Sequence, residues 1–201
     1  MRGSDPDAAV YYLVRMLEGG EEPRFVVRRM VIFAAEDVGN ADPRALSVAT
    51  AALQALELVG MPEGVLPLTQ AVTYLALAPK SNTVLSSYAA ARKLVLEKGP
   101  LPVPLSLRNA PTKLMESMGY GGGYKYPHNF DGHYVAEQYL PDAIREETVV
   151  RLSDSGLEKA LAERLAEARD KAGFWTTGAI TGCWWCMAIP RWTRRATMAT
   201  G

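Results

Sequence analysis

The sequence predicts an all-α protein, in which a helical bundle is followed by a proline- and glycine-rich loop region and a C-terminal helix. Apolar residues recur at three- and four-residue steps between clear helix start and stop signals. No strand-like alternation persists in residues 5–98, and alanine is frequent on the predicted helix faces. Because small side chains let helices approach closely, we expect these helices to pack into one bundle.

Proline marks the start of the first two predicted helices. Asp5 is placed to cap a helix that opens at Pro6 and ends near Gly19, since proline suits the first helical position and glycine the exit. A second helix is predicted from Pro23 towards Glu36-Asp37. We interpret this acidic pair as a helix end or as the partner of a neighbouring arginine, because no catalytic partner is identifiable.

Three further helices complete the predicted bundle. An alanine-rich helix opens at Asp42-Pro43 and runs to residue 59, a fourth lies between Pro67 and Ala78, and Ser81 caps a fifth that ends before Gly99. The alanines expected at helix contacts are Ala45, Ala49, Ala51, Ala52, Ala71, Ala76, Ala89, Ala90 and Ala91.

The composition of the sequence changes after Gly99. Three prolines, at positions 100, 102 and 104, alternate with apolar residues and predict an extended segment. A short helix is predicted around residues 111–118, followed by a glycine- and aromatic-rich loop to about residue 140. Ser155 and Glu158 have the spacing of a capping box for a last amphipathic helix, 156–171.

Length and composition limit the possible classes of protein. A chain of 201 residues allows one domain, or one domain with an appendage, and 48% hydrophobic residues suffice for a soluble core. No apolar run reaches the roughly 18 residues of a membrane span, and the N-terminus lacks the apolar core of a signal peptide. Cys183 and Cys186 are the only cysteines, so disulfides do not build residues 1–182. We expect a cytoplasmic protein that makes no membrane contact.

The last thirty residues differ from the rest of the chain. Residues 172–201 contain all four tryptophans, both cysteines and three arginines, but no Asp, Glu or Lys. Such a change is found in functional tails, in translated out-of-frame ends and in fusion remnants. We favour a non-homologous or disordered tail and keep it out of the fold argument. The Cys183-x-x-Cys186 pair has no second Cys or His pair nearby, so no zinc or redox site is predicted.

Positive charge is concentrated in residues 79–128. This stretch has seven lysines and arginines against two glutamates, whereas residues 1–78 balance at −4 and residues 129–201 at −1. Such segregation indicates an anionic partner. The candidate DNA- or partner-binding residues are Lys80, Arg92, Lys93, Arg108, Lys113, Tyr120, Tyr124, Lys125 and Tyr126.

These candidates have both functional and structural interpretations. Lysine and arginine would contact phosphates, and the tyrosines would stack on unpaired bases. In the structural interpretation, residues 80–82 form a helix cap, Arg108 and Asn109 hold loop backbone, and the tyrosines pack under the glycine loop.

The sequence shows no convincing catalytic set. The phosphate-loop pattern Gly-x-x-x-x-Gly-Lys-Ser/Thr is absent, and the glycine run at residues 119–123 has no strand before it and no Lys-Ser/Thr after it. We therefore predict no catalytic, cofactor-binding or metal-binding residue in this chain. One enzymatic alternative is a metal hydrolase that uses His128, Asp131 and His133, and stoichiometric bound metal would support it. The plainer interpretation is two loop histidines without a shared ligand geometry.

Several long motifs resemble one protein family, in the same order. They are residues 2–9 (RGSDPDAA), 35–43 (AEDVGNADP), 71–82 (AVTYLALAPKSN) and 102–113 (PVPLSLRNAPTK), continued by 124–128 (YKYPH) and 139–141 (YLP). Together they resemble the C-terminal region of the replication-associated recombination protein A group of AAA+ ATPases. This group is also called the MgsA or Werner-helicase-interacting ATPase family. The resemblance covers residues 1 to about 145.

The resemblance implies an architecture. Residues 1–98 would be a helical oligomerisation bundle like a clamp-loader collar, residues 99–145 a family-specific loop and short-helix region, and residues 146–171 an amphipathic helix. Family members carry an ATPase module before this region. Walker A, Walker B and the arginine finger are all missing from this chain, so ATP and Mg²⁺ would belong to that module and the chain alone would hydrolyse nothing.

The resemblance also implies partners. It predicts a homotetramer, association with DNA at replication forks or ends, and contact with single-strand-binding protein and the replication machinery, in a nucleoid-associated cytoplasmic location. A freestanding helical adaptor that contacts only proteins stays open as an alternative. A low salt dependence of any DNA association would favour the adaptor.

Overall fold

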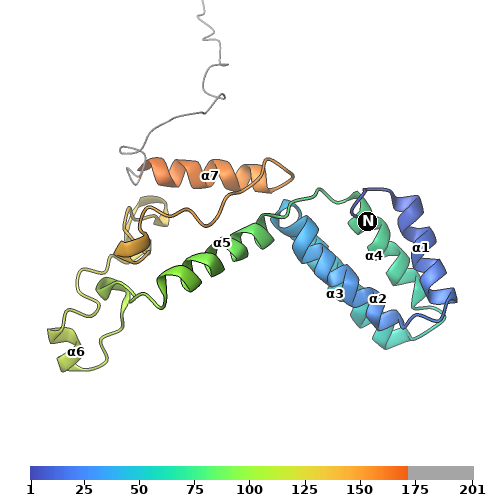
Figure 1. The fold of residues 1–201 in the computed structure, drawn as a ribbon, viewed down its shortest axis with the longest axis horizontal. Helices are drawn as coiled ribbons and strands as arrows, with labels where there is room; N and C mark the ends of the chain where they lie inside the picture. The colour runs from blue at the N-terminus through green and yellow to red at the C-terminus, as the bar shows by residue number, and fades with distance from the viewer. Residues whose placement is uncertain (172–201) are drawn as a thin grey trace, which may run out of the picture.

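The computed structural model describes residues 1–171, and every regular element in that range is helical. The predicted all-α fold class is therefore confirmed. Four helices form a bundle, and a fifth leaves it as an extended arm (Figure 1). The last described helix begins beside the place where the arm meets the bundle. Residues 172–201, which include Cys183 and Cys186 and the predicted non-homologous or disordered tail, lie outside the described residues.

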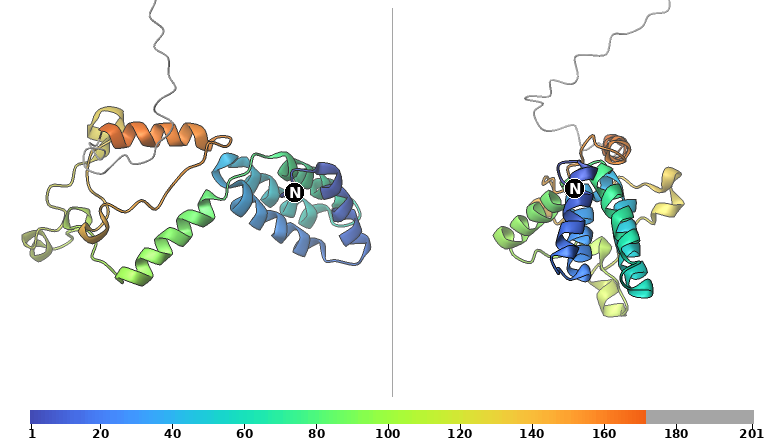
Figure 2. Two further views of the ribbon diagram at one scale, coloured as in Figure 1. Left: turned by 45° about the horizontal axis from the view of Figure 1, so that its top comes forward. Right: turned by 90° about the vertical axis from the view of Figure 1, so that its right-hand side faces the viewer.

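The bundle consists of α1 (Pro6–Glu18), α2 (Pro23–Phe33), α3 (Arg44–Val59) and α4 (Val65–Leu77). Helix α4 packs against both α1 and α3, and α2 packs against α3, as the two views of Figure 2 show. Asp5 caps α1 as predicted, since its Oδ1 accepts a hydrogen bond of 3.0 Å from the Ala8 amide. Helix α4 begins two residues before the predicted Pro67, because proline is tolerated in a first turn whose amides have no helical partner.

One apolar core holds the four helices together. Its largest fully buried apolar side chains are Leu13, Met30, Leu68, Leu75, Val27 and Val38. Full burial of such a side chain contributes about 1.5–3 kcal/mol relative to exposure. Small residues complete the packing: Ala45, Ala49 and Ala52 place a smooth stripe of α3 against its neighbours. Ala71 and Ala76 of α4 are buried as well, as the close-packing prediction requires.

The alanines of the fifth predicted helix do not belong to this core. Ala89 is exposed, and Ala90 and Ala91 are half-buried. Ala51, which lies on α3, is exposed as well. Helix α5 (Thr83–Lys98) runs away from the bundle, and Thr83 is its only buried residue. The prediction that the alanines of α5 pack inside the bundle is therefore wrong. The functional division at residues 98 and 99 stays a prediction.

A π-helical turn between α2 and α3 contacts the start of the arm. Helix α2 continues into η1 (Ala34–Val38), where the Gly39 amide donates to the Ala34 carbonyl, and a 3-10 turn η2 (Gly39–Ala41) follows. Gly39 has φ +52°, and a β-carbon there would lie 3.1 Å from Val84 Cγ2 and 3.2 Å from the Ser81 carbonyl oxygen. A side chain at position 39 would thus press on the start of α5, in addition to the strain of the left-handed backbone.

The region after the arm consists mostly of loops. Its helical turns are η3 (Leu105–Leu107), η4 (Pro127–Asn129), η5 (Asp131–His133) and η6 (Asp142–Ile144). The predicted short helix is α6 (Lys113–Ser117), at the far end of the arm, where Thr112 Oγ1 accepts from the Met115 amide. The last described helix is α7 (Glu158–Lys171). No helix of residues 1–171 is both long and apolar enough to cross a membrane.

The segment before α7 returns to the bundle and docks there. The Leu157 amide donates a 2.8 Å hydrogen bond to the Ala41 carbonyl. Gly156 has φ +52°, and a β-carbon at this position would lie 2.2 Å from the Ala41 oxygen and 2.8 Å from Pro79 Cγ. Only glycine therefore permits this close approach. We call residues 34–42, 78–83 and 153–158 the joint.

We predict that Gly156→Ala loosens the joint and lowers the free energy of unfolding by more than about 1–2 kcal/mol, because it combines a left-handed backbone with a backbone collision. Gly123→Ala is the matched control, since Gly123 has φ +74° but open space around its α-carbon. Urea unfolding of both variants followed by circular dichroism checks this. Equal losses in the two variants would contradict the docking role of position 156.

Candidate interaction surfaces

Two aspartates organise the bundle side of the joint. Arg2 donates to Asp37 through both Nε and Nη2, at 2.6 and 2.8 Å, and the Asp37 carbonyl accepts the Ser81 amide at 2.8 Å. The interpretation of Glu36-Asp37 as the partner of an arginine is therefore confirmed. These contacts link the chain before α1 to the π-helical turn and to the segment before α5.

The second aspartate, Asp42, is buried and has several donors. Arg44 Nε donates to its Oδ1 at 2.8 Å, and the Tyr74 hydroxyl donates to its Oδ2 at 2.5 Å. The hydrogen bond from Arg44, helped by Tyr74, holds the pKa of Asp42 below its usual value although burial alone would raise it. The hydrogen bond to Asp42 in turn raises the pKa of the Tyr74 hydroxyl.

A buried glutamate closes the joint from the other side. Glu158, at the start of α7, is fully buried. Its Oε2 accepts from Ser81 Oγ at 2.8 Å and from Ser153 Oγ at 2.7 Å, and its Oε1 accepts from Thr83 Oγ1 at 2.5 Å. The Ser153 amide also donates to Oε2 at 2.9 Å. Four donors from two distant segments thus surround one carboxylate.

This geometry corrects two capping predictions. The side chain of Glu158 accepts from Ser153 and not from Ser155, so it does not form the capping box predicted from the 155–158 spacing. The N-cap position of α5 is Asn82 and not Ser81, although Ser81 Oγ accepts from the Thr83 amide at 3.3 Å. In both places the buried carboxylate is involved: Ser153 supplies the donors that the capping box assigned to Ser155, and Ser81 Oγ donates to Glu158 Oε2.

Burial and hydrogen bonding act in opposite directions on Glu158. Desolvation alone would raise its pKa, but the hydrogen bonds from Thr83, Ser153 and Ser81 outweigh it and hold the pKa below the usual value. No buried side-chain nitrogen or oxygen in the described part of the chain lacks a hydrogen-bond partner. The polar residues of the joint are thus satisfied internally, which is typical of a structural element.

The predicted binding residue Lys80 also belongs to the joint. It is half-buried, and its Nζ donates to the Ala76 carbonyl at 3.0 Å and to the Ala78 carbonyl. Burial lowers its pKa, with Asp37 opposing that effect in part. The structural interpretation offered for this lysine therefore has direct geometric support.

Arg108 and Tyr120 are paired with each other. Arg108 Nε donates to the Val103 carbonyl at 2.7 Å, its Nη1 lies 3.2 Å from the Tyr120 hydroxyl, and its guanidinium carbon lies 5.1 Å from the ring centroid. This contact fastens the proline-rich segment to the glycine loop. In the same region Lys125 Nζ forms an ion pair of 3.1 Å with Glu137.

The other candidate residues are more exposed. Arg92 and Lys93 are exposed on α5, where Lys93 lies 3.8 Å from Glu97. Lys113, Tyr124 and Tyr126 are exposed in the loop region beyond it. The structure therefore does not gather the nine residues into one surface. It places Lys80 at the joint, Arg92 and Lys93 on the arm, and the remaining six in residues 108–126.

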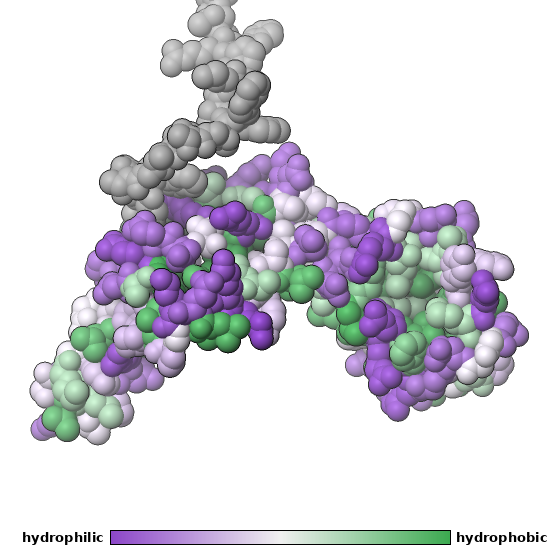
Figure 3. Space-filling model, in the orientation of Figure 1, coloured by the Kyte–Doolittle hydropathy of each residue, from purple (hydrophilic) through white to green (hydrophobic). Residues whose placement is uncertain are grey.

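The outer face of α5 is a surface that sequence reasoning missed. Val84, Leu85, Tyr88, Val95 and Leu96 are all exposed large apolar residues. The opposite face, at residues 87, 90, 91 and 94, is half-buried. Hydrophobic surface is visible along the part of the arm occupied by α5 in Figure 3. The sequence feature that could have revealed this face is that apolar residues lie on both sides of the helix. Such a helix is expected to pack against a neighbour on each side.

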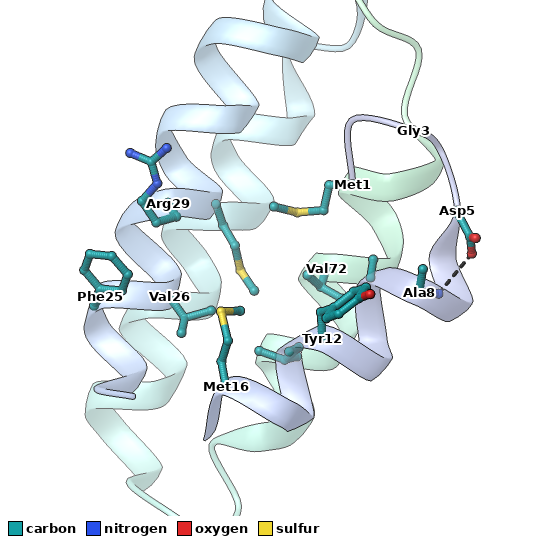
Figure 4. Close-up of a pocket in the computed structure, with 13 residues that line it drawn as sticks. Met1, Gly3, Asp5, Ala8, Tyr12, Met16, Phe25, Val26, Arg29 and Val72 are labelled. Atoms are coloured by element: carbon teal, nitrogen blue, oxygen red, sulfur yellow. Dashed lines mark hydrogen bonds between the residues drawn. The ribbon is translucent and has the colours of Figure 1, made fainter. Parts of the chain in front are cut away.

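A second apolar surface lies on the bundle. A groove of about 340 Å³ runs between α1 and α2, lined by Met1, Tyr12, Met16, Phe25 and Met30 among others (Figure 4). Tyr12, Met16 and Phe25 are the exposed large apolar residues of its lining, which also includes the exposed Arg29. Methionine-rich grooves adapt readily to apolar side chains of a partner.

The two histidines lie against each other. The rings of His128 and His133 have centroids 4.9 Å apart, and Tyr126 packs on His128 at 5.0 Å. Among the residues whose side chains the structure describes, no group of three or more His, Cys, Asp or Glu is arranged to hold a metal ion.

Comparison with known proteins places these features in a family. Residues 3–169 match the family described as MgsA AAA+ ATPase C terminal. Replication-associated recombination protein A of Coxiella burnetii is 48% identical over 82% of this chain and 38% of its own length, and the Escherichia coli K12 protein of that name is 46% identical over 83% and 37%. ATPase WRNIP1 of Dictyostelium discoideum is 50% identical over 73% of this chain and 17% of its own length. The chain thus spans less than half the length of these relatives.

We predict a pH dependence that originates at Glu158. Because its pKa is lowered in the folded chain, its stabilisation is fully present above the unfolded value of about 4.3 and is lost as the pH falls through the folded value. Glu158→Gln should lose about 1–3 kcal/mol at neutral pH and should lack this acid-dependent loss. Thermal unfolding of both proteins between acid and neutral pH, at constant ionic strength, measures it.

Glu163→Gln is the control for this experiment, because Glu163 is exposed on the same helix. It should keep the wild-type pH profile. Parallel profiles for wild type and Glu158→Gln would show that the buried carboxylate is not the group responsible.

Proposed function

The chain belongs to the MgsA family of AAA+ ATPases and corresponds to their C-terminal region, and on that premise we propose that it is the self-association module of a replication-associated recombination ATPase. In this proposal it assembles into a homotetramer and hydrolyses nothing alone. ATP and Mg²⁺ would be bound by an ATPase module that lies outside this sequence.

The glycine loop of this chain does not fit a nucleotide phosphate. In a phosphate cradle the backbone amides point at the ligand. Here the Gly121 amide donates to the Leu105 carbonyl at 2.9 Å, and the Gly122 and Tyr124 amides donate to Gly119 and Gly121. These amides already donate to backbone carbonyls of the protein and do not point at a ligand. The loop also follows helix α6 and not a strand. This observation supports assigning nucleotide chemistry to the separate module.

The observation that carries the proposal is the outward apolar face of α5. Tyr88 and Leu96 are each 67% exposed and Val95 is 63% exposed, although the helix is sixteen residues long and otherwise regular. Soluble monomers rarely leave several large apolar residues exposed on one side of one helix, and such surfaces typically mark contacts with another protein. A second copy of the chain meets this requirement without any further component.

A second candidate function is contact with DNA through the loop region beyond α5. Lys113, Tyr124 and Tyr126 are exposed there together with Lys125, whose ion pair with Glu137 is half-exposed. The relatives are named for replication-associated recombination, and the surplus of positive charge in residues 79–128 suits a nucleic acid. Fork or end structures, single-strand-binding protein and the replication machinery are the proposed partners. A protein-only adaptor is the competing proposal.

We predict that the full chain is a tetramer in solution at micromolar concentrations. Multi-angle light scattering over a concentration series measures this directly, since association depends on protomer concentration. A mass of one chain at tens of micromolar would contradict the proposal.

We predict that Lys113→Glu combined with Lys125→Glu weakens binding of fork DNA and reduces the slope of log affinity against log salt by about 1–2. The control is Lys159→Glu combined with Arg164→Glu, which makes the same charge change on exposed positions of α7. Fluorescence anisotropy at several salt concentrations gives both quantities. An unchanged affinity and slope would exclude this loop as the DNA contact and favour the adaptor.

A further inference from the structure

The outer face of α5 is a continuous stripe. At about 100° per residue, Val84, Leu85, Tyr88, Arg92, Val95 and Leu96 fall within roughly 120° of the helix surface. All six side chains are exposed. The stripe is apolar apart from Arg92 near its centre, and Lys93 and Lys98 lie beside it. A partner must therefore offer apolar surface together with negative charge.

The bundle offers such a surface at the groove between α1 and α2. Three residues of its lining, Tyr12, Met16 and Phe25, are apolar or aromatic and exposed, and Arg29 is exposed beside them (Figure 4). The α1–α2 turn, at the end of the groove where Met16 and Phe25 lie, carries Glu18, Glu21 and Glu22, which are all exposed. A helix that lies in an apolar groove is anchored by side chains at three- and four-residue steps, as Leu85, Tyr88, Arg92 and Leu96 are spaced.

Electrostatics favours the same pairing. Residues 1–78, which form the bundle, have a formal net charge of −4, and residues 79–128, which contain the arm, have a formal net charge of +5. Contact between two arms would bring Arg92, Lys93 and Lys98 of each copy together. Contact between arm and groove brings them towards Glu18, Glu21 and Glu22.

The arm cannot reach the groove of its own chain. Helix α5 meets the bundle at residues 34–41 and runs away from it. The α1–α2 turn lies at the opposite end of the bundle, as Figures 1 and 2 agree. Any contact between these two surfaces is therefore intermolecular.

We propose that the outer face of α5 docks into the α1–α2 groove of a second copy of the chain, with the basic end of the arm against Glu18, Glu21 and Glu22. This inference rests on the proposed self-association and specifies its surfaces. The two surfaces differ, so the contact is head-to-tail and closes into a ring when successive rotations complete a turn. A tetramer built in this way uses every arm and every groove.

Mixing two variants tests the head-to-tail arrangement. The arm variant is Tyr88→Gln with Leu96→Gln, and the groove variant is Tyr12→Gln with Met16→Gln. All four positions are exposed, and glutamine keeps helix propensity without adding charge. Each variant alone should associate at least about tenfold more weakly than wild type. An equimolar mixture should form dimers, because one intact arm meets one intact groove. Light scattering gives the masses, and circular dichroism shows that each variant is folded.

A charge exchange provides a second, milder test. Arg92→Glu should weaken association about tenfold, as should Glu21→Lys with Glu22→Lys, and all three changes in one chain should restore part of the loss. Glu63→Lys is the control, since Glu63 is exposed at the α3–α4 turn outside the groove lining. It should associate as wild type does.

The outcomes separate this inference from the proposed function. A monomeric wild type would contradict both. A tetrameric wild type whose arm and groove variants also assemble normally would overturn the docking inference and leave self-association intact. Two weakened variants that stay monomeric when mixed would show that an intact arm does not pair with an intact groove, which also overturns it.

Discussion

The buried carboxylate of Glu158 determines how the C-terminal half of the chain is attached to the bundle. An ion without a counter-charge is costly to bury unless hydrogen bonds compensate it. Here the donors come from residues 81–83 and from Ser153, and no cation of the described side chains takes part. The carboxylate is therefore satisfied only when the start of α5, the segment before α7 and the helix itself are assembled together.

Most elements of the fold were predictable because their signals are local. Asp5-Pro6 marked the start of α1, glycine marked the ends of α1, α3 and α5, and three- to four-residue spacing showed the buried faces. The capping box at 155–158 was wrong because the spacing does not show which donors the Glu158 side chain meets. It accepts from the amide and hydroxyl of Ser153, and also from Ser81, which lies 77 positions away.

The candidate site was predictable only in part, for the same physical reason. Charge counting identified where positive side chains accumulate, but not which of them are already engaged. Lys80 donates to carbonyls at the joint, and Arg108 is paired with Tyr120. The apolar face of α5 was overlooked because its alanines fitted an intramolecular packing pattern equally well. Periodicity shows that a helix has an apolar face, but it does not show whether that face is covered by the same chain.

The position of Glu158 in the chain has a consequence for biosynthesis. The contacts of the bundle are complete once residue 78 has been made, so this unit can fold while the ribosome is still adding the arm and loops. The joint, in contrast, needs a residue synthesised eighty positions later. We therefore expect two stages of maturation, in which a nascent chain carries a finished bundle and an unsecured arm, and in which the arm is fixed only when α7 leaves the ribosome.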